Sequence, residues 1–400
     1  YFSVVAGSSA TVAGSVHIVP PMTEEAGYTA PLGQAVKART GVTTMVTGRI
    51  TQPQDAERII AAGHADLCGM TRAMICDPEL GEKARTGRAD DIRACIGCNQ
   101  ACIGHFHAGY PISCIQNPVS GRETFLGRTE PARTRRKVMV VGGGPGGMKC
   151  AAVASARGHD VTLFEREFRL GGQARLAQAL PHRAEFGGII TNLVREMELA
   201  GAETCMGIAV DEKVIAEFAP DTIVVATGAE PRWPEFEGRN DAHVVDAWQV
   251  LRNEANVGKS VLVADWRADW IGIGIAEHLA QRGHQVKLAV NGYMPGQTIQ
   301  MYVRDASIGR LQSLGVEMVP YVRLFGVDEN AVYLQHIMND EPVICEDVDT
   351  LVLCQGHISR NTMEDLLRGL GIEHRLIGDC VSPRTAEEAV LEGLLAGRAV

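Results

Sequence analysis

The sequence predicts an α/β protein in which parallel strands alternate with helices. Residues 1–92 alternate short apolar strands with helical segments, and such alternation is typical of parallel β/α units. A glycine-rich turn at residues 142–147 joins an apolar strand to an Ala-rich helix, and a second strand–helix–strand set occupies residues 259–290. We therefore expect a set of β/α units followed by two doubly wound units.

The first 92 residues contain predicted strands at 42–46 and 65–69, with a helix at 55–62 between them. In a (β/α)8 barrel the loops after the last two strands often bind phosphate through backbone N–H groups and an arginine. Ordinary turns with solvated arginines are the alternative, and three β/α units cannot close an eight-stranded barrel. Small and basic residues follow the two strands: Gly48, Arg49, Thr71 and Arg72.

The chain opens directly on a predicted strand at residues 1–5, which runs into a Gly/Ser loop. No initiator Met or capping segment precedes this strand. We expect the chain to begin inside a domain.

Four cysteines lie close together in the sequence, and their spacing suits an iron-sulfur cluster. They form CxxCxxxC followed, after eleven intervening residues, by a fourth cysteine. Four thiolates complete a [4Fe-4S] cluster, whereas structural zinc sites usually pair two CxxC units. Zinc and unligated cysteines stay open as alternatives. The predicted ligands are Cys95, Cys98, Cys102 and Cys114.

The loop that carries these cysteines is expected to be irregular. Gly97 and Gly104 allow it to curl, while Asn99 and Gln100 disfavour a regular helix. The histidines that follow the third ligand, His105 and His107, are interpreted as exposed loop residues; the alternative is a hydrogen bond toward the cluster.

Composition narrows the class of protein. A disulfide framework fits poorly, because 11 cysteines in 400 residues do not form a small secreted domain. The net charge of −10 argues against general nucleic-acid binding, and no apolar run is long enough to cross a membrane. We expect a cytoplasmic enzyme that acts on a small molecule, with no nucleic-acid or membrane partner; the sequence leaves a homo-oligomer open.

The GxGxxG motif at Gly142, Gly144 and Gly147 follows a strand at 137–141, after a basic linker at 128–137. The glycines allow a tight turn and the close approach of a pyrophosphate to the helix N-terminus. Glu165 ends the next strand, where a carboxylate can accept hydrogen bonds from a ribose. The motif predicts adenine-dinucleotide binding; a Rossmann unit that has lost its ligand is the alternative.

Two later segments are associated with this site. Gly228 ends the strand at 222–229, and Asp379 lies in LIGDC just before an Ala- and Gly-rich helix. Both segments could be plain βα connections. Flavoprotein reductases with two domains, however, place such features against FAD.

The segment 247–354 begins as another Rossmann unit, with strands at 259–264 and 284–290 around a helix at 271–282. Its connecting loop at 265–269 reads DWRAD instead of a glycine motif. Large side chains would hold the backbone away from phosphates, and two carboxylates would repel them. We therefore expect this unit not to bind NAD(P)H.

The order of these motifs resembles one family along essentially the whole chain. RADDIRACIGCNQACIG followed by SCIQNP is similar to the iron-sulfur segment of old yellow enzyme relatives. That family includes trimethylamine dehydrogenase, 2,4-dienoyl-CoA reductase and N-methyl amino acid demethylases. The resemblance implies the C-terminal part of an FMN-binding (β/α)8 barrel at 1–92 and a [4Fe-4S] segment with linker at 93–130. It further implies a FAD- or ADP-binding domain at 131–246 plus 355–400, with a degenerate NAD(P)-binding-like domain inserted at 247–354.

The resemblance also implies roles for individual residues. In the family the last two barrel loops hold the FMN phosphate, and the glycine-rich domain holds FAD, or ADP in the trimethylamine dehydrogenase branch. The implied FMN phosphate contacts are Gly48, Arg49, Thr71 and Arg72. The implied FAD or ADP contacts are Gly142, Gly144, Gly147, Glu165, Gly228 and Asp379. The barrel strands that carry the family's substrate acid and base residues are absent from these 400 residues, so no catalytic residue is assigned.

Two branches of the family run the electrons in opposite directions. A reductase takes hydride from NAD(P)H and reduces an activated C=C bond; a demethylating dehydrogenase oxidises an N-methyl group and passes electrons through the cluster to a protein acceptor such as an electron-transfer flavoprotein. The CxxCxxxC spacing resembles the reductase branch, whereas the glycine-free loop at 265–269 resembles the dehydrogenase branch. Losing a phosphate-binding turn disables the step in which NAD(P)H donates hydride, so we expect N-methyl amine oxidation. The alternatives are enoate or 2,4-dienoyl-CoA reduction and an electron-transfer module without a substrate site.

Two further groups of residues are expected to be structural. Trp266 and Trp270 are interpreted as packing at a domain interface rather than stacking on an adenine. The remaining cysteines are too scattered for a second cluster, and we expect most of them in the core.

Overall fold

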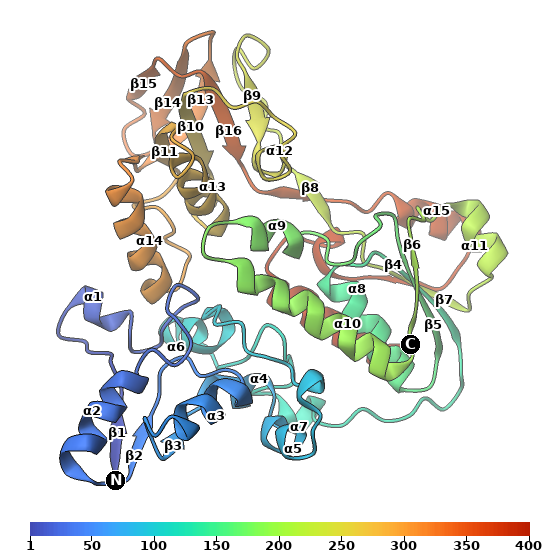
Figure 1. Cartoon of the computed structure of the whole chain (residues 1–400). Coiled ribbons are helices and arrows are strands. Elements are labelled where there is room, and N and C mark those ends of the chain that lie inside the picture. Colours follow the sequence, from blue (N-terminus) through green and yellow to red (C-terminus); the bar gives the residue numbers. More distant parts are fainter.

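The computed structural model describes residues 1–400 as two large parallel sheets and a smaller N-terminal α/β part (Figure 1). The N-terminal part contains one parallel sheet in the order β1-β2-β3. Its strands are β1 (Phe2–Val4), β2 (Thr44–Val46) and β3 (Leu67–Cys68). Its helices are α1 (Val12–Ser15), α2 (Ala30–Thr40), α3 (Pro53–Ala61), α4 (Thr71–Cys76) and α5 (Leu80–Arg85). The α/β class is thus confirmed, with strands shorter than predicted.

Four helices of this part, α1, α2, α4 and α5, were not predicted, and the longest of them is α2. Its buried residues, Ala30 and Gly33, are small, so they give no apolar stripe. Its boundaries do carry a signal, because Pro31 lies in its first turn and Gly41 follows its end in the left-handed conformation.

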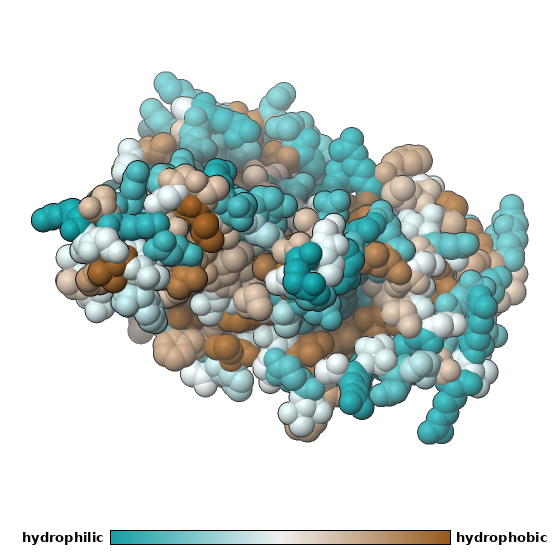
Figure 2. All heavy atoms as spheres, turned by 60° about the horizontal axis from the view of Figure 1, so that its bottom comes forward, coloured by the Kyte–Doolittle hydropathy of each residue, from teal (hydrophilic) through white to brown (hydrophobic).

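The surface of the N-terminal part carries several large hydrophobic side chains. Figure 2 turns the bottom of Figure 1 toward the viewer and shows brown hydrophobic residues gathered among teal ones. Phe2 on β1 and Leu67 on β3 are 46% and 48% exposed, and both strands lie at the edges of their sheet. None of the helices combines the length and apolar content that a membrane span requires.

The cysteine segment folds as turns rather than strands. The main elements are a π-helical turn (Gln100–Gly104), α6 (His105–Ala108) and α7 (Glu123–Leu126). Asn99 and Gln100 are not part of a regular α-helix, as expected, but Gln100 begins the π-helical turn. Asn99 adopts a left-handed conformation, and its side chain bonds to Val19 O and Arg72 instead of competing for the turn. Its carbonyl accepts the π-type bond from Gly104 N at 3.1 Å.

The first large sheet is fully parallel, in the order β18-β7-β4-β5-β6. Its strands are β4 (Lys137–Val141), β5 (Asp160–Glu165), β6 (Glu203–Met206), β7 (Thr222–Val225) and β18 (His374–Leu376). Its helices are α8 (Pro145–Ala156), α9 (Ala174–Ala179), α10 (Gly188–Ala200), α11 (Glu212–Phe218), α15 (Met363–Leu370) and α16 (Ala386–Ala399). Helix α8 packs between α10 and α16. Small residues such as Gly146 and Gly393 allow this, since Gly393 lies directly against the backbone of Gly146.

The second large sheet is also parallel, in the order β12-β11-β10-β16-β9, and an antiparallel sheet β13-β14-β15 adjoins it. The parallel strands are β9 (Val244–Asp246), β10 (Ser260–Asp265), β11 (Gln285–Val290), β12 (Glu317–Val319) and β16 (Thr350–Cys354). The antiparallel strands are β13 (Val322–Val327), β14 (Ala331–His336) and β15 (Pro342–Glu346). The helices are α12 (Ala247–Leu251), α13 (Trp270–Ala280) and α14 (Met301–Ser313). A two-stranded link, β8 (Ala229–Pro231) with β17 (His357–Ser359), connects the two large sheets.

Candidate functional site

The glycine-rich loop between β4 and α8 has the geometry of a nucleotide-binding turn. Gly142 has φ +112°, and a Cβ there would lie 2.3 Å from Ala226 O. A Cβ on Gly147 would lie 2.0 Å from Gly142 O. By contrast, a Cβ on Gly144 would meet no atom within 4 Å. The first and third glycines are required by packing, while the second faces open space that phosphates could approach.

The N-terminus of α8 behind this loop is free to receive an anion. No side chain caps it, and its first residue is Pro145. The first-turn N–H groups therefore have no side-chain partner, which suits a pyrophosphate. Glu165 at the end of β5 lies beside the same loop: its carboxylate accepts hydrogen bonds from Gly143 N (2.6 Å) and Glu167 N (2.8 Å).

Gly228 and Asp379 lie at the same end of the sheet, as the sequence predicted. Gln173, which the sequence analysis did not identify, lies next to both. Gln173 Nε2 donates to Asp379 Oδ2 at 2.9 Å and lies 3.7 Å from where a Cβ of Gly228 would be. Asp379 Oδ1 accepts from Arg384 N at 3.0 Å. Burial raises the pKa of Asp379. The GGQ triplet at 171–173 was the available signal, because Gly172 lies against Gly144.

Replacing Gly147 with alanine is expected to abolish adenine-nucleotide binding and to cost about 3 kcal/mol of stability, because the new methyl group meets the Gly142 carbonyl. The nucleotide released by heat from purified protein and a urea unfolding curve measure the two effects. Gly309→Ala is the matched control, since that glycine is within α14 and has free space around it. An alanine at 147 with unchanged nucleotide content would contradict the assignment.

The corresponding loop of the second unit is closed by its own side chains. Asp265 Oδ1 accepts from Arg267 N (3.1 Å) and Ala268 N (3.0 Å), and Asp269 caps Ile271 N (2.9 Å). Arg267 in turn pairs with Asp269 at 2.8 Å. Burial, followed by the charge of Asp269, raises the pKa of Asp265 well above its usual range. The N–H groups that a pyrophosphate would need thus already donate hydrogen bonds to the side chains of Asp265 and Asp269.

The four predicted cluster ligands share one segment and are partly buried. One backbone N–H group donates to a ligand sulfur: Gly97 N lies 3.5 Å from Cys95 Sγ. Backbone N–H groups also act to lower the pKa of Cys98, Cys102 and Cys114, against the effect of burial. Such bonds favour thiolate and are one of the features by which proteins set cluster potentials. Burial raises the pKa of the Cys95 thiol to about 11, so metal binding there would release a proton.

Binding of a cluster by these four cysteines stays a prediction. No three His, Cys, Asp or Glu side chains of the structure converge on one ion position. In a [4Fe-4S] cluster each thiolate binds a different iron, so the ligands stand farther apart than those of one zinc ion. The donor chemistry of the four cysteines fits such a cluster.

Cys76, which we expected only as a core residue, also belongs to this region. It is fully buried and accepts a weak hydrogen bond from Gln116 Nε2 at 3.5 Å. Hydrogen bonding with the thiol of Cys76 lowers the pKa of Cys114. Because Cys76 lies at the end of α4, nineteen positions before Cys95, spacing alone did not connect it with the motif.

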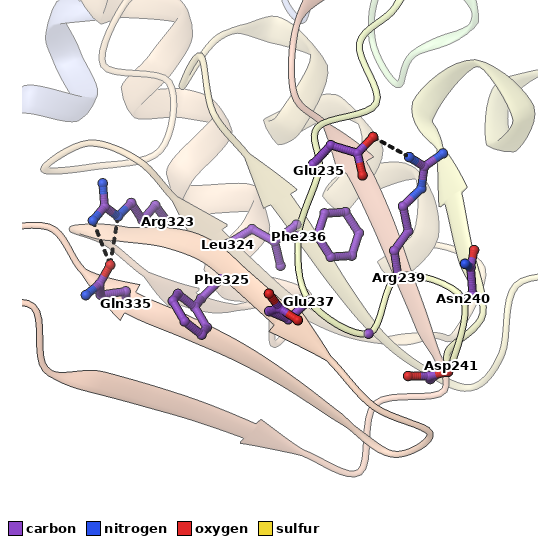
Figure 3. Close-up of a pocket in the computed structure, with 11 residues that line it drawn as sticks. Glu235, Phe236, Glu237, Arg239, Asn240, Asp241, Arg323, Leu324, Phe325 and Gln335 are labelled. Atoms are coloured by element: carbon purple, nitrogen blue, oxygen red, sulfur yellow. Dashed lines mark hydrogen bonds and ion pairs between the residues drawn. The ribbon is translucent and has the colours of Figure 1, made fainter.

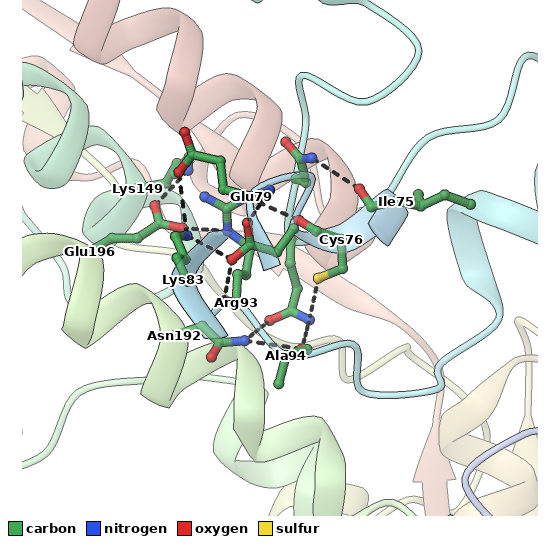
Figure 4. A network of polar contacts seen from close by, with 12 residues as sticks. Ile75, Cys76, Glu79, Lys83, Arg93, Ala94, Lys149, Asn192 and Glu196 are labelled. Carbon is green, nitrogen blue, oxygen red and sulfur yellow. Dashed lines mark hydrogen bonds and ion pairs between the residues drawn. The ribbon is translucent and has the colours of Figure 1, made fainter. Parts of the chain in front are cut away.

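A buried polar network attaches the cysteine segment to the glycine-loop domain (Figure 4). Arg93 Nε donates to Glu196 Oε1 at 2.6 Å, and Lys149 Nζ donates to Glu196 Oε2 at 2.6 Å. Asn192 on α10 donates to Gln116 Oε1 at 2.6 Å. One carboxylate of α10 thus pairs with a cation from the cysteine segment and another from α8.

The predicted phosphate residues lie beside the cysteine segment. Gly48 packs on Thr29, and Thr71 begins α4. Arg72 Nη1 donates to Pro20 O (2.8 Å) and Asn99 Oδ1 (2.6 Å). Arg49 is 6% exposed, pairs with Glu185 and donates to Glu24 O, while its Nε has no partner. The contacts of these four residues with a phosphate remain a prediction.

Of the two histidines after the third cysteine, His107 is exposed as expected, whereas His105 is partly buried; both lie on a short helix rather than in a loop. His105 Nε2 lies 2.9 Å from Glu387 Oε2 of α16. His107 stacks edge-on against Tyr302 of α14, with ring centroids 5.0 Å apart. Both residues lie on α6, which therefore contacts both large units.

Trp270 packs between units as expected, with Arg183 Cζ 4.0 Å from its ring centroid, while Trp266 is 43% exposed. Of the cysteines expected in the core, five are buried and two are partly exposed: Cys76, Cys150, Cys345, Cys354 and Cys380, then Cys68 and Cys205.

A shallow surface pocket of about 820 Å³ lies elsewhere, between the loop 235–241 and β13 (Figure 3). Acidic and basic side chains line it together, including Glu235, Arg239 and Arg323. It contains none of the predicted site residues.

Family models match both parts of the chain. Residues 136–393 match the family described as pyridine nucleotide-disulphide oxidoreductase, and residues 9–91 match the NADH:flavin oxidoreductase / NADH oxidase family. These matches confirm the resemblance drawn from the motifs. The chain therefore carries a domain of the FMN type and one of the FAD/pyridine-nucleotide type.

Individual relatives match along most of the chain. The N,N-dimethylglycine/sarcosine dehydrogenase of Chromohalobacter salexigens is 31% identical over 98% of this chain and 63% of its own length. The NADH oxidase of Thermoanaerobacter brockii is 36% identical over 68% of this chain and 42% of its own. A solved 2-naphthoyl-CoA reductase complex superposes with a TM-score of 0.90 at 26% identity, covering 100% of this chain and 60% of that one. The chain thus spans less than two thirds of these proteins.

Proposed function

The chain belongs to the flavin oxidoreductases that join an NADH:flavin oxidoreductase part to a pyridine nucleotide-disulphide oxidoreductase part, and from this premise we propose that it serves oxidative N-demethylation. The substrate is a methylated amine or amino acid. Electrons pass from FMN through a [4Fe-4S] cluster at Cys95, Cys98, Cys102 and Cys114 to a protein acceptor.

The contrast between the two nucleotide loops carries this proposal. The loop at Gly142–Gly147 is open and α8 is uncapped, so an adenine nucleotide can bind there. The loop at 265–269 is closed by Asp265, and Asp269 caps α13. A protein that cannot bind NAD(P)H at this second loop has no evident hydride donor, which favours electrons entering from a substrate.

The chain's residues provide a binding frame for each group. The loops at Gly48 and Arg72 would bind the FMN phosphate, the four cysteines the cluster, and Glu165 with Asp379 the FAD or ADP. When bound, the flavin would accept hydride from an N-methyl carbon, water would hydrolyse the resulting iminium to formaldehyde and amine, and the cluster would pass the two electrons on singly. Arg72 supports the connection between flavin and cluster, because it bonds to Asn99 next to Cys98.

The activities of the relatives support both the proposal and its rival. The dimethylglycine/sarcosine dehydrogenase matches nearly the whole chain, whereas the NADH oxidase matches two thirds of it. The CxxCxxxC spacing favours the rival, an NAD(P)H-dependent enoate or 2,4-dienoyl-CoA reductase. We weight the closed loop more heavily, because it removes a binding site.

The proposal extends to partner and compartment. An electron-transfer flavoprotein or another redox protein would accept the electrons, and the chain would act in the cytoplasm. The unpaired state of all 11 cysteines supports a reducing compartment.

The full-length protein is expected to release one formaldehyde for each two electrons transferred when it is given sarcosine, dimethylglycine, N-methylproline or trimethylamine with a flavoprotein acceptor. Formaldehyde is measured by derivatisation, and acceptor reduction by absorbance. Cinnamate and an unsaturated acyl thioester, each with NADPH, are the controls for the reductase. Consumption of NADPH with an enoate and no formaldehyde from any amine would contradict the proposal.

A further inference from the structure

Arg183 is a buried cation without a partner. It is 8% exposed, and its Nε has no hydrogen-bond partner. Its guanidinium lies between two aromatic rings, 4.0 Å from the Trp270 centroid and 4.7 Å from that of Phe186. Aromatic faces attract a cation but do not neutralise it. A buried charge of this kind needs a nearby anion.

The acidic groups nearest to Arg183 are the thiol of Cys98 and the carboxylate of Asp269, and Asp269 is already paired. Burial lowers the pKa of Arg183 to about 10, while Cys98 and Asp269 act in the opposite direction, so the residue stays protonated at neutral pH. Asp269 already pairs with Arg267 at 2.8 Å and caps α13. A small, partly open cavity of about 40 Å³ lies between the cysteine loop and the second unit, and Cys98, Arg183 and Glu277 all line it. Glu277 already pairs with Arg310 and His182, so Cys98 remains.

We propose that Arg183 is a positioning residue for the redox centre: its buried charge, held by Trp270 and Phe186 beside Cys98, compensates the negative charge of the cluster and raises its reduction potential. A neutral thiol at Cys98 would leave Arg183 without a counter-charge. A cluster bound by four thiolates is anionic and becomes more negative on reduction, so a fixed cation beside it stabilises the reduced form. This inference rests on the cluster of the proposed function.

Arg183 lies where the second unit adjoins the cysteine loop. Trp270 is the first residue of α13, directly after the closed loop. The guanidinium therefore packs against the second unit through Trp270, and it shares a cavity with the cysteine loop. In this chain the unit that has lost its nucleotide loop still contributes a side chain to the surroundings of the cluster.

The test is a redox titration of the cluster EPR signal in anaerobically purified protein. Replacing Arg183 with glutamine is expected to lower the equilibrium constant for reduction of the cluster on the order of tenfold. For a one-electron couple, this lowers the reduction potential by about 59 mV. Arg183→Lys keeps the charge and should restore most of the potential. Arg323→Gln is the matched control, because Arg323 lies on the exposed edge strand β13 and should leave the potential unchanged. The shift should persist in 1 M salt, since buried charges are weakly screened.

The outcomes separate this inference from the proposed function. Wild-type protein without a cluster signal would overturn the cluster and this inference with it. A wild-type signal whose potential is the same in Arg183→Gln would overturn the inference alone. If both the glutamine and the lysine variants bind the cluster at equally lowered potential, the shape of Arg183 rather than its charge is responsible, and the inference fails.

Discussion

Replacing Cys98 with serine is expected to remove the cluster. A serine hydroxyl is a poor ligand for iron in this setting, and three thiolates leave one iron without a protein ligand. The loss also leaves Arg183 without its counter-charge. We expect wild-type protein to be brown, with about four iron atoms per chain, and the variant to be depleted of iron and silent in EPR after dithionite reduction.

Cys205→Ser is the matched control for this change. Cys205 is also partly exposed, but it lies on β6, outside the cysteine segment, so iron content should not change. Two results would contradict the assignment: unaltered iron in the Cys98 variant, or wild-type protein that is colourless with one zinc per chain.

Replacing Glu196 with alanine is expected to destabilise the protein by about 3–5 kcal/mol, because it removes the partner of the buried Lys149 and of the partly buried Arg93. Arg93 and Lys149 both bond to this carboxylate, at 2.6 Å each, and the Lys149 side chain is 7% exposed. Urea unfolding measures the change in stability. The iron content along the same urea series reports the unfolding of the cysteine segment. Glu198→Ala is the control: that exposed residue pairs only with Arg195 at the surface, so its loss should cost no more than about 0.5 kcal/mol.

The same carboxylate predicts a pH dependence. Burial opposes ionisation of Glu196, but Arg93 and Lys149 outweigh it and lower the pKa from 4.5 to about 2. A depressed pKa means that the stabilisation is complete above 4.5 and is lost as the pH falls toward 2. The Glu196→Ala variant should lack this part of the acid destabilisation. Parallel stability profiles for variant and wild type across that range would contradict the role of the network.

The sequence was most informative where chemistry restricts residue type. Strand β4 spans Lys137–Val141 as predicted, and the predicted Ala-rich helix follows the glycine-rich turn as α8. Gly142 and Gly147 could be recognised because a Cβ at either would meet backbone. The sequence predicted that the loop at Asp265 has lost its phosphate site. It did not reveal that Asp265 accepts hydrogen bonds from the N–H groups of Arg267 and Ala268.

Features made by contacts between distant segments could not be read from the sequence. Arg183 and Cys98 are brought together by the packing of three segments, and neither flanking sequence marks the pair. The π-helical turn at Gln100 depends on Asn99 being held by Val19 and Arg72. Glu196 looks like an ordinary helix carboxylate until Arg93 and Lys149 are placed beside it.

The direction of electron flow is tested most directly by the choice of reductant. Oxidised full-length protein is mixed anaerobically with NADPH or with a methylated amine, and flavin bleaching and the cluster EPR signal are followed with time. We predict that the amine reduces flavin and cluster, while NADPH at the same concentration reduces neither, because Asp265 and Asp269 occupy the loop it would need. Rapid reduction by NADPH, with no reduction by any methylated amine, would contradict the account.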